Sequence, residues 1–572
     1  YTVRIGTEHA DIYRGRVGFR RLEAAADLAR DGLDLRINGQ RVFARGAVWT
    51  PLDLRFPHAG EDALRPVLER VVAAGMNMLR VPGIATYESD AFYDLCDTLG
   101  ILVWQDFMFA NLDYPESDPE FMAEVQREAR QVLARLAGRP CLAVLCGGSE
   151  VAQQVAMLGL DPALANGPLY AGLLPALVRE ADVQAPYIPS APFGGELPFR
   201  TDRGVANYYG VGAYRRGLED CRRSEVKFAA ECLAFSNVPD HAALAAIDAP
   251  GGLVAHHPAW KAGVPRDAGA GWDFEDVRDH YFGLLFGLEP GVLRGSDHDR
   301  YLELSREVTG EVMAEVFGEW RREASPCAGG LVLWLTDLRP GAGWGVLDHR
   351  GEPKAAYHHL RRALAPVAVW GTDEGLGGLV AHIANDRAAP WRGTLRVALY
   401  RDFEVPVAEA AIEVDLPAHG AGAHNVEALL GRFVDIGWAY RFGPPAQDLV
   451  VLSLAASGEQ GEQLVSQSFR FPVGRPTRRE SAAQLGLSAS LQPLDEDRAE
   501  LTVATRRLAY GVRVDLPGFV AQDDAFSVEP GHERRVTLRR RIAPGETPPP
   551  ATVASLTALN LFGRIASVAL TP

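Results

Sequence analysis

The sequence lacks the features that mark several common classes of protein. None of its apolar runs reaches the roughly 18–20 residues that a membrane-spanning helix needs, which argues against a membrane protein. Its six cysteines include no Cys-x-x-Cys pair, so neither a zinc knuckle nor a thioredoxin-like redox centre is expected. No Gly-rich phosphate-binding turn follows the first apolar segment, which disfavours a doubly wound nucleotide-binding sheet.

Positive charge is also in deficit. The 58 Lys and Arg residues face 74 Asp and Glu residues, giving a net charge of −16. Nucleic-acid backbones attract basic surfaces, so we do not expect a nucleic-acid partner. A neutral carbohydrate is indifferent to the sign of the charge. The 47% hydrophobic share is that of an ordinary globular chain.

The chain has no initiator Met and no signal-peptide pattern, and it opens as if inside a β-domain. We therefore expect residues upstream to be missing. The sequence does not tell whether the protein is cytoplasmic or periplasmic. It also does not tell whether the protein is a monomer or a homodimer.

The 572 residues exceed what one hydrophobic core accommodates, so several domains are expected. Short alternating stretches at 2–5 and 16–19 are typical of β-strands. Apolar runs then alternate with amphipathic segments as repeated β–α units. Helical periodicity ends after Pro366, and a linker with two prolines and a glycine spans 471–479. The predicted domains are the end of a truncated N-terminal β-sandwich (1–33), a barrel (34–365) and two β-sandwiches (366–476 and 477–572).

The predicted fold class is therefore α/β plus all-β, a (β/α)8 TIM barrel flanked by immunoglobulin-like β-sandwich domains. An open doubly wound sheet is the alternative. The predicted parallel strands are 42–47, 76–81, 101–106, 142–147, 187–190, 226–231 and 331–335. The predicted helices are 62–74, 89–99, 119–137, 169–183 and 301–323. Ser89 is expected to cap its helix by accepting a backbone N–H bond.

Several predicted strands close on an ionisable residue, namely Arg80, Asp106, Glu150, Glu231 and Asp337. Groups that act on substrate lie at the carboxyl ends of barrel strands, and an ionisable group there is either paired or functional. Glycoside hydrolysis needs one carboxylic acid to protonate the leaving oxygen and one carboxylate to act at the anomeric carbon. Glu150 and Glu231 lie 81 residues apart, which suits the fourth and seventh strands of a barrel. Two structural ion pairs would be the simpler interpretation of the same residues.

The barrel segments resemble glycoside hydrolase family 2, specifically its β-mannosidase branch. The resemblance covers about residues 16–366. The segments that carry it are Ile37–Asp53, Ala74–Val81, Phe92–Ala110 with Tyr114–Pro115, Pro186–Gly195, Tyr209–Gly212, Leu333–Asp337 with Trp344, and Pro353–Ala355.

The resemblance implies a retaining mechanism through a glycosyl-enzyme intermediate, with no metal and no organic cofactor. Glu150 would be the acid/base and Glu231 the nucleophile, and the pKa of Glu150 should be the higher of the two. Arg80 would keep Glu231 ionised. The substrate-binding residues would be Arg80, Asp106, Ser149, Tyr209 and Trp334, of which Asp106, Tyr209 and Trp334 would line the subsite for the terminal sugar.

The chain departs from the family where Ser149 replaces the Asn that binds the sugar's 2-hydroxyl. Losing that contact should lower the rate or relax selectivity at carbon 2. Further departures are Pro82–Ile84, Asn207–Tyr209, Cys232–Phe235 and Thr336. The predicted substrate is a terminal β-mannoside. Another β-glycoside, a barrel that binds carbohydrate without turnover, and a transglycosylase remain open.

Other residues have simpler explanations. Large apolar residues such as Trp334 are more often core than ligand platform. The pairs His256–His257 and His358–His359 point in different directions on a regular element, which disfavours a metal site. Cys232 is expected to be a buried, inert thiol.

Overall fold

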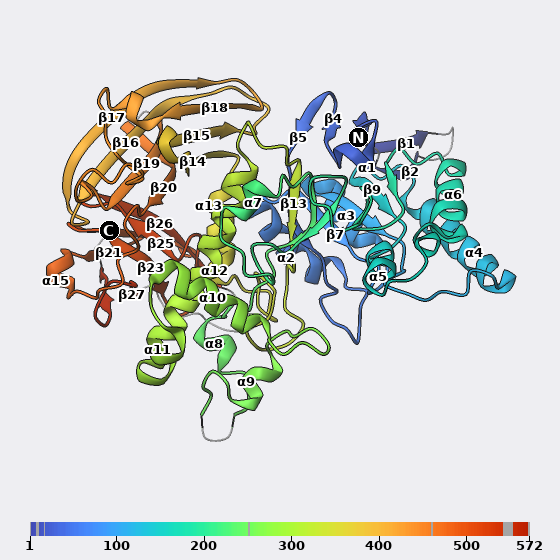
Figure 1. The fold of residues 1–572 in the computed structure, drawn as a ribbon, viewed down its shortest axis with the longest axis horizontal. Helices are drawn as coiled ribbons and strands as arrows, with labels where there is room; N and C mark the ends of the chain where they lie inside the picture. Colours follow the sequence, from blue (N-terminus) through green and yellow to red (C-terminus); the bar gives the residue numbers. More distant parts are fainter. Residues whose placement is uncertain are drawn as a thin grey trace.

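A computed structural model describes residues 2–6, 11–16, 18–249, 252–458, 461–541 and 553–569. At its centre is an eight-stranded sheet of parallel strands in the order β10-β9-β8-β7-β6-β13-β12-β11 (Figure 1). Its strands are β6 Ala44–Val48, β7 Met78–Val81, β8 Leu102–Asp106, β9 Leu142–Cys146, β10 Tyr187–Ile188, β11 Ala206–Tyr208, β12 Ala229–Cys232 and β13 Gly329–Val332. Within the described part of the chain β10 and β11 do not pair, but Phe193 and Val205 form an antiparallel bridge beyond them. The predicted (β/α)8 barrel is confirmed.

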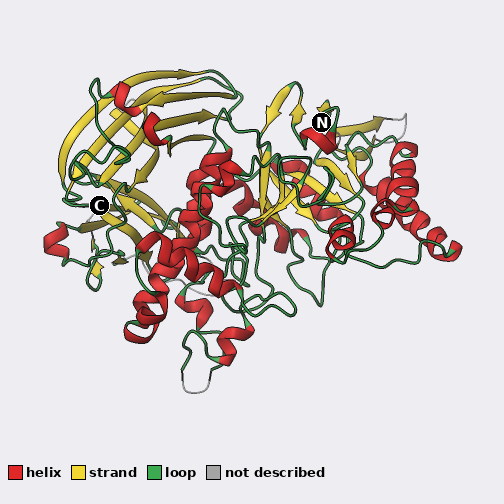
Figure 2. Ribbon diagram, viewed as in Figure 1, coloured by secondary structure: helices red, strands yellow, loops and turns green. Residues whose placement is uncertain are grey.

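Helices lie around this sheet (Figure 2). The α-helices are α1 Leu28–Asp31, α2 Glu61–Ala73, α3 Asp90–Leu99, α4 Pro119–Leu136, α5 Val151–Met157, α6 Leu174–Glu180, α7 Asp220–Arg223, α8 His241–Leu244, α9 Pro258–Ala262, α10 Phe274–Phe286, α11 Pro290–Ser296, α12 His298–Trp320 and α13 Ala355–Ala363. Between α5 and α6 lie a 3-10 turn, η1 Pro162–Asn166, and a π-helical turn, η2 Pro168–Leu173. Helices α8 to α11 form one long insertion between β12 and β13.

The seven strands expected from apolar runs each overlap a barrel strand, whereas β11 was missed. Its three residues include a polar Asn207, so no apolar run marks it. The expected cap at Ser89 is wrong in its chemistry. Ser89 stands at the N-cap of α3, but it makes no capping bond, because its hydroxyl donates to the carbonyl oxygen of Ala59 at 2.9 Å.

Ahead of the barrel, β1 Thr2–Gly6 and β2 Asp11–Arg16 pair antiparallel, and β3 Leu22–Glu23, β4 Leu35–Ile37 and β5 Gln40–Val42 form a second small sheet. The strand expected at 16–19 is wrong. Strand β2 ends at Arg16, Gly18 and Phe19 belong to no strand, and Val17 lies outside the described residues.

Two β-sandwiches follow the barrel and lie beside it, at the left in Figure 1. The first packs β14-β15-β18 against β17-β16-β19-β20, and the second packs β24-β26-β22-β21-β29 against β25-β23-β27-β28. The first comprises β14 Val367–Asp373, η3 Gly375–Gly377, β15 Leu379–Asn385, β16 Trp391–Arg401, β17 Val405–Leu416, β18 Gly420–Asn425, α14 Val426–Leu429, β19 Leu449–Gly458 and β20 Gly461–Arg470. The second comprises α15 Ala482–Leu485, β21 Ser488–Pro493, β22 Arg498–Ala504, β23 Ala509–Asp515, β24 Phe519–Ala521, β25 Phe526–Val528, β26 Glu533–Arg540, β27 Ser555–Thr557, β28 Ile565–Ala566 and β29 Val568–Ala569.

Three clusters of buried apolar side chains stabilise these units, one in the barrel and one inside each sandwich. Both sandwiches also contribute to the barrel's cluster, for example through Tyr400 and Tyr510. Polar contacts join the same units, including an ion pair of 2.6 Å between Arg362 on α13 and Asp523. The sandwiches therefore pack against the outer helices of the barrel. The exact domain boundaries stay a prediction.

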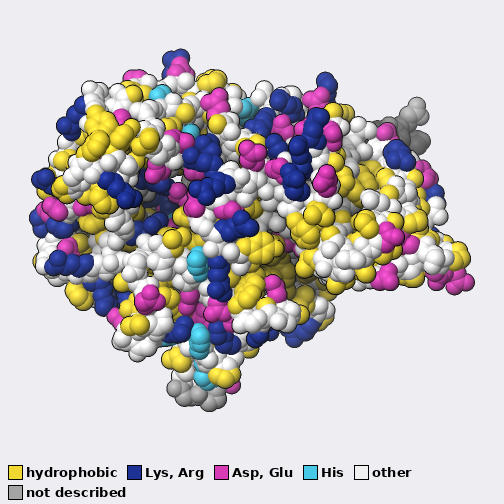
Figure 3. Space-filling model, viewed as in Figure 1, with side chains coloured by type: hydrophobic (Ala, Val, Ile, Leu, Met, Phe, Trp, Pro, Cys, Tyr) yellow, Lys and Arg dark blue, Asp and Glu magenta, His cyan; other side chains and the backbone are white. Residues whose placement is uncertain are grey.

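On the face shown in Figure 3, basic and acidic side chains are interspersed rather than gathered by sign. Among the described residues no helix combines the length and apolar character needed to cross a membrane. The same residues contain no group of three or more His, Cys, Asp or Glu side chains placed to hold a metal ion.

Candidate active site

Arg80 is the centre of a polar cluster at the carboxyl ends of the barrel strands. It lies on β7 and is fully buried. Its Nη2 donates to Asp106 Oδ2 at 2.8 Å, and its Nη1 donates to Glu231 Oε1 at 2.9 Å. Asp106 ends the neighbouring strand β8, whereas Glu231 lies on β12. One guanidinium therefore joins the carboxylates of β8 and β12, two strands that do not pair with each other, because its several N–H donors can serve two acceptors.

Ser149 belongs to the same cluster. Its hydroxyl donates to Asp106 Oδ2 at 2.8 Å and accepts from Arg80 Nη2 at 3.0 Å and from the Gly83 N–H at 3.2 Å. Its relative exposure is only 4%. The hydroxyl is thus fully engaged by protein groups, and in this arrangement it offers no free hydrogen bond to a sugar.

Two glycines bring the backbone after β9 close to its neighbours. A Cβ at Gly147 would lie 2.3 Å from the carbonyl oxygen of Pro189, and one at Gly148 would lie 2.7 Å from that of Phe109. Only glycine tolerates such approaches. Glu150 then adopts a left-handed conformation, φ 58°, immediately before α5. The turn therefore presents Glu150 at the end of the fourth barrel strand.

Two side-chain amides fix the carboxyl group of Glu150. Gln153 Nε2 donates to its Oε1 at 2.7 Å, and Asn207 Nδ2 donates to the same oxygen at 2.8 Å. The other oxygen, Oε2, accepts no hydrogen bond from the described residues. Oε2 is therefore the oxygen that is available to exchange a proton with a bound molecule.

Glu231 lies on the seventh barrel strand and is held from two sides. Arg80 bonds its Oε1, and the hydroxyl of Tyr209 donates to its Oε2 at 2.7 Å. Burial raises the pKa of Glu231 to about 7, although Arg80 and Tyr209 act in the opposite direction, and the charge of Glu150 raises it further. As expected, Arg80 favours the ionised form of Glu231. Burial has the larger effect, however, so the pKa of Glu231 is raised overall. The influence of Glu150 places the two carboxylates within electrostatic reach of each other.

Trp334 is the predicted site residue that the structure joins least to this cluster. It follows β13, is half-buried, and packs edge-on against Trp344 with ring centroids 5.3 Å apart. No hydrogen bond or ring contact of the described residues links it to Arg80 or Glu231. Asp337, which also follows this strand, forms an ion pair with the buried Lys354 at 2.5 Å.

Sequence reasoning missed four groups that shape the site. Trp104 Nε1 donates to Asp106 Oδ1 at 2.7 Å, the Gly83 N–H donates to Asp106 Oδ2 at 3.1 Å, and Gln153 and Asn207 hold Glu150. Trp104 and Asn207 are close to residues that were singled out, Asp106 and Tyr209. Alternation along β8 could have indicated Trp104, because residues two apart share a face of a strand.

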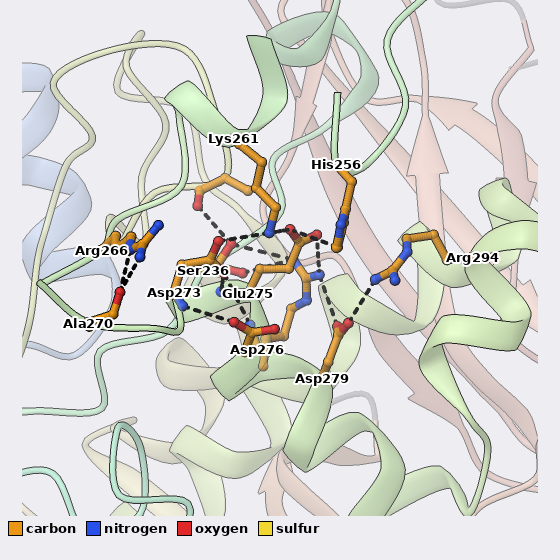
Figure 4. A network of polar contacts seen from close by, with 12 residues as sticks. Ser236, His256, Lys261, Arg266, Ala270, Asp273, Glu275, Asp276, Asp279 and Arg294 are labelled. Carbon is orange, nitrogen blue, oxygen red and sulfur yellow. Dashed lines mark hydrogen bonds and ion pairs between the residues drawn. The ribbon is translucent and has the colours of Figure 1, made fainter. Parts of the chain in front are cut away.

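The loop that follows β12 is anchored by the long insertion (Figure 4). The buried Arg278 on α10 donates to the carbonyl oxygen of Ser236, five residues after Glu231, at 3.4 Å. Arg278 in turn pairs with Glu275 at 3.0 Å and with Asp279 at 3.1 Å. This network ties α10 to the segment that leaves the strand bearing Glu231.

Comparisons with known proteins find relatives of nearly the whole chain. No family model matches the chain. Beta-mannosidase B of Aspergillus fumigatus is 26% identical over 545 residues, covering 90% of this chain and 61% of the relative. Beta-mannosidase B of Aspergillus niger is 28% identical over 380 residues, covering 62% of this chain and 43% of the relative. The chain thus spans less than two thirds of the curated relatives it matches.

Solved structures agree on the fold. The beta-D-mannosidase of Dictyoglomus thermophilum superposes with a TM-score of 0.76 at 23% identity, covering 97% of this chain and 65% of that one. In sequence the chain is therefore similar to proteins named beta-mannosidase, and in fold it is similar to a solved beta-D-mannosidase. The exo-chitosanase of Amycolatopsis orientalis also superposes, with a TM-score of 0.70 at 17% identity, covering 98% of this chain and 67% of that one. For this β-mannosidase-like chain both superpositions support the barrel and sandwich architecture.

Proposed function

We propose that the chain is the catalytic part of a retaining exo-β-glycosidase that releases a terminal β-linked mannose. The observation that carries the proposal is the convergence on Glu231 of Arg80 and Tyr209, with Glu150 presented from the fourth strand within electrostatic reach. Glycoside hydrolysis by two carboxylates needs such a pair at a barrel mouth. The curated relatives named beta-mannosidase suggest the sugar.

In the first step, Glu150 donates a proton from Oε2 to the leaving oxygen while Glu231 attacks the anomeric carbon. The bond from carbon 1 to the leaving oxygen breaks, and an ester forms between carbon 1 and Glu231. Arg80 and Tyr209 fix the orientation of the attacking carboxylate, which lowers the entropy cost of reaching the transition state. Gln153 and Asn207 keep Glu150 turned so that its other oxygen faces the substrate.

In the second step, the now ionised Glu150 takes a proton from water as that water attacks carbon 1. The ester to Glu231 breaks, the sugar leaves with its original β configuration, and both carboxyl groups return to their starting states. An acceptor sugar in place of water would give transglycosylation with the same residues.

The same mechanism on another β-glycoside is the second candidate, and Ser149 favours it. Its hydroxyl is bonded to Asp106, Arg80 and the Gly83 N–H, so the 2-hydroxyl contact expected of the family's Asn has no counterpart at this position. Selectivity at carbon 2 is where mannosides differ from glucosides.

The test is an aryl β-glycoside panel combined with covalent labelling. We expect hydrolysis to be fastest for the β-mannoside, and 2-deoxy-2-fluoromannosyl fluoride to give a single adduct located on Glu231 by peptide mass spectrometry. A faster reaction with another β-glycoside would overturn the assigned sugar while keeping the mechanism. Carbohydrate binding without turnover or adduct across the panel would overturn the enzymatic proposal.

The pKa of Glu231 predicts the acidic side of the pH profile. A nucleophile must be ionised, and the pKa of Glu231 lies near 7 because of burial. We expect kcat/KM to fall about tenfold per pH unit below that value. Tyr209→Phe removes a donor that lowers this pKa, so the variant's falling limb should move to higher pH. A rate that stays constant down to pH 5 in both proteins would contradict the assignment.

Ser149→Ala should have a small kinetic effect. The hydroxyl touches Arg80, Asp106 and Gly83, so its loss is expected to cost about 1–3 kcal/mol of unfolding free energy. We expect kcat/KM to fall by no more than about tenfold, measured beside urea unfolding, because no direct sugar contact is removed. A loss of about 100-fold or more with unchanged stability would show instead that Ser149 binds the substrate.

A further inference from the structure

A cavity of about 500 Å³ lies between the barrel's outer helices and the second sandwich. Its walls come from α8, α12, α13, β23, β24 and β27. Neither Glu150 nor Glu231 lines it. We call it the interdomain cavity and define it by Asp240, His241, Arg306, Arg513, Arg541 and Arg564. Its size is that of sites for small organic molecules, which occupy about 300–1,000 Å³.

Arg306 is the residue that gives the interdomain cavity its chemistry. It lies on α12 with a relative exposure of 6%, and its Nε donates to the carbonyl oxygen of Pro239 at 2.8 Å. Its buried Nη2 has no hydrogen-bond partner, and among the described residues no carboxylate lies within ion-pair distance of its guanidinium. Burial lowers the pKa of Arg306 to about 9 and the neighbouring charge of Arg513 lowers it further, although the charges of Glu303, Asp240 and Asp299 raise it. A buried cation without an ion-pair partner is costly, so a bound anion would stabilise it.

The acidic residues of the cavity wall do not fill that role, because most have a cation of their own. Asp524 pairs with Arg513 at 2.6 Å, and Glu352 pairs with Arg541 at 2.7 Å. Asp240 pairs with Arg350 and Glu303 with Arg300, whereas Glu307 is hydrogen-bonded to the ring of His359 at 2.9 Å. Asp515, which has no ion pair among the described residues, is exposed to solvent.

Further positive charge gathers beside Arg306. Arg564 lines the cavity, is exposed, and forms no ion pair within the described part of the chain. The charge of Arg306 is the largest cause of the lowered pKa of His241, and burial is the second. The charges of Arg564 and Arg513 act in the same direction. The charges of Arg306, Arg564 and Arg513 thus act on the same part of the cavity wall and disfavour a further positive charge on His241, a setting that favours an anionic ligand.

We propose that the interdomain cavity binds a small organic anion of about the size of a sugar phosphate, with its phosphate or carboxylate group held by Arg306 and Arg564. A guanidinium presents a planar fork of N–H donors that matches either oxyanion. The volume leaves room for an uncharged part of the ligand beyond the oxyanion. The proposal does not depend on the glycosidase activity, because the cavity and the catalytic cluster share no residue.

Isothermal titration calorimetry on the complete chain tests the proposal at fixed ionic strength. The probes are glucose 6-phosphate, gluconate, inorganic phosphate and neutral glucose. We expect glucose 6-phosphate or gluconate to bind with a Kd below about 1 mM, and glucose to show no heat of binding. If inorganic phosphate bound as tightly as the organic anions, the proposal that the cavity also holds an organic part of the ligand would be wrong. The absence of binding by every anion at 10 mM would overturn the site.

Variants locate the binding. Arg306→Met should weaken the binding of the tightest probe at least tenfold. If that buried variant does not fold, exposed Arg564→Gln serves instead and should weaken binding at least threefold. The matched control is Arg127→Gln, an exposed arginine on α4 whose loss should leave the Kd unchanged. Equal affinity of the wild type and Arg564→Gln, or of the wild type and Arg306→Met, would contradict the proposal.

Discussion

Replacing Glu231 by alanine is expected to lower kcat/KM for an aryl β-mannoside by at least about 10⁴-fold. Without this carboxylate no covalent intermediate can form, and Arg80 and Tyr209 lose the group they orient. Steady-state kinetics on purified protein provide the measurement. Added azide should restore turnover by entering the vacated space, and the product should be the α-glycosyl azide, whose configuration is inverted.

The companion variant Glu150→Ala separates the two roles. The loss of activity in Glu150→Ala should be large for substrates with a poor leaving group. It should be small for an activated aryl glycoside, whose leaving group needs no proton. Azide should then attack the glycosyl-enzyme and give the β-glycosyl azide. Glu275→Gln is the control, since Glu275 is a buried carboxylate in the α10 network outside the site. If both catalytic variants gave the same azide anomer, or if Glu275→Gln also formed a glycosyl azide, the assignment would be wrong.

The positions of the two carboxylates could be predicted because strand order in a β–α barrel follows the sequence. Apolar runs marked most strands, and the interval between Glu150 and Glu231 fits the observed fourth and seventh strands, β9 and β12. Strand β11 could not be found in this way, since Ala206–Tyr208 is short and partly polar. The contact between Asn207, which lies on β11, and Glu150 therefore could not be predicted from the pattern alone.

The direction of a side chain and its degree of burial were also beyond the sequence. Ser149 was expected to face the sugar as a shortened Asn, but its hydroxyl lies among Arg80, Asp106 and Gly83. Arg80 was expected to keep Glu231 ionised, yet burial has the larger effect on the pKa of Glu231. Both outcomes depend on how several loops close over the strand ends, and neighbours in sequence carry no information about that closure.

Replacing Arg80 by methionine should have the second largest effect, because it removes the cation shared by two buried carboxylates. Asp106 is 0% exposed and would keep only neutral donors, including Trp104 Nε1 and the Gly83 N–H. Leaving a buried charge without its partner costs about 3–5 kcal/mol, which urea unfolding would detect. The pKa of Glu231 should rise above its value near 7, because the influence of Arg80 that lowers it is gone.

The kinetic consequence distinguishes a role in positioning and ionisation from a merely structural one. We expect Arg80→Met to reduce kcat/KM at pH 7 by about 10³-fold, and raising the pH should recover part of the loss as Glu231 ionises. Arg278→Met is the matched control, since it removes another fully buried arginine and should destabilise the protein without moving the pH profile. Should Arg80→Met fail to fold, Arg80→Lys keeps the charge but loses the fork, and its pH limb should stay near that of the wild type while kcat falls. An Arg80→Lys limb displaced upward by more than one pH unit would mean that the planar guanidinium, rather than its charge, sets the ionisation of Glu231.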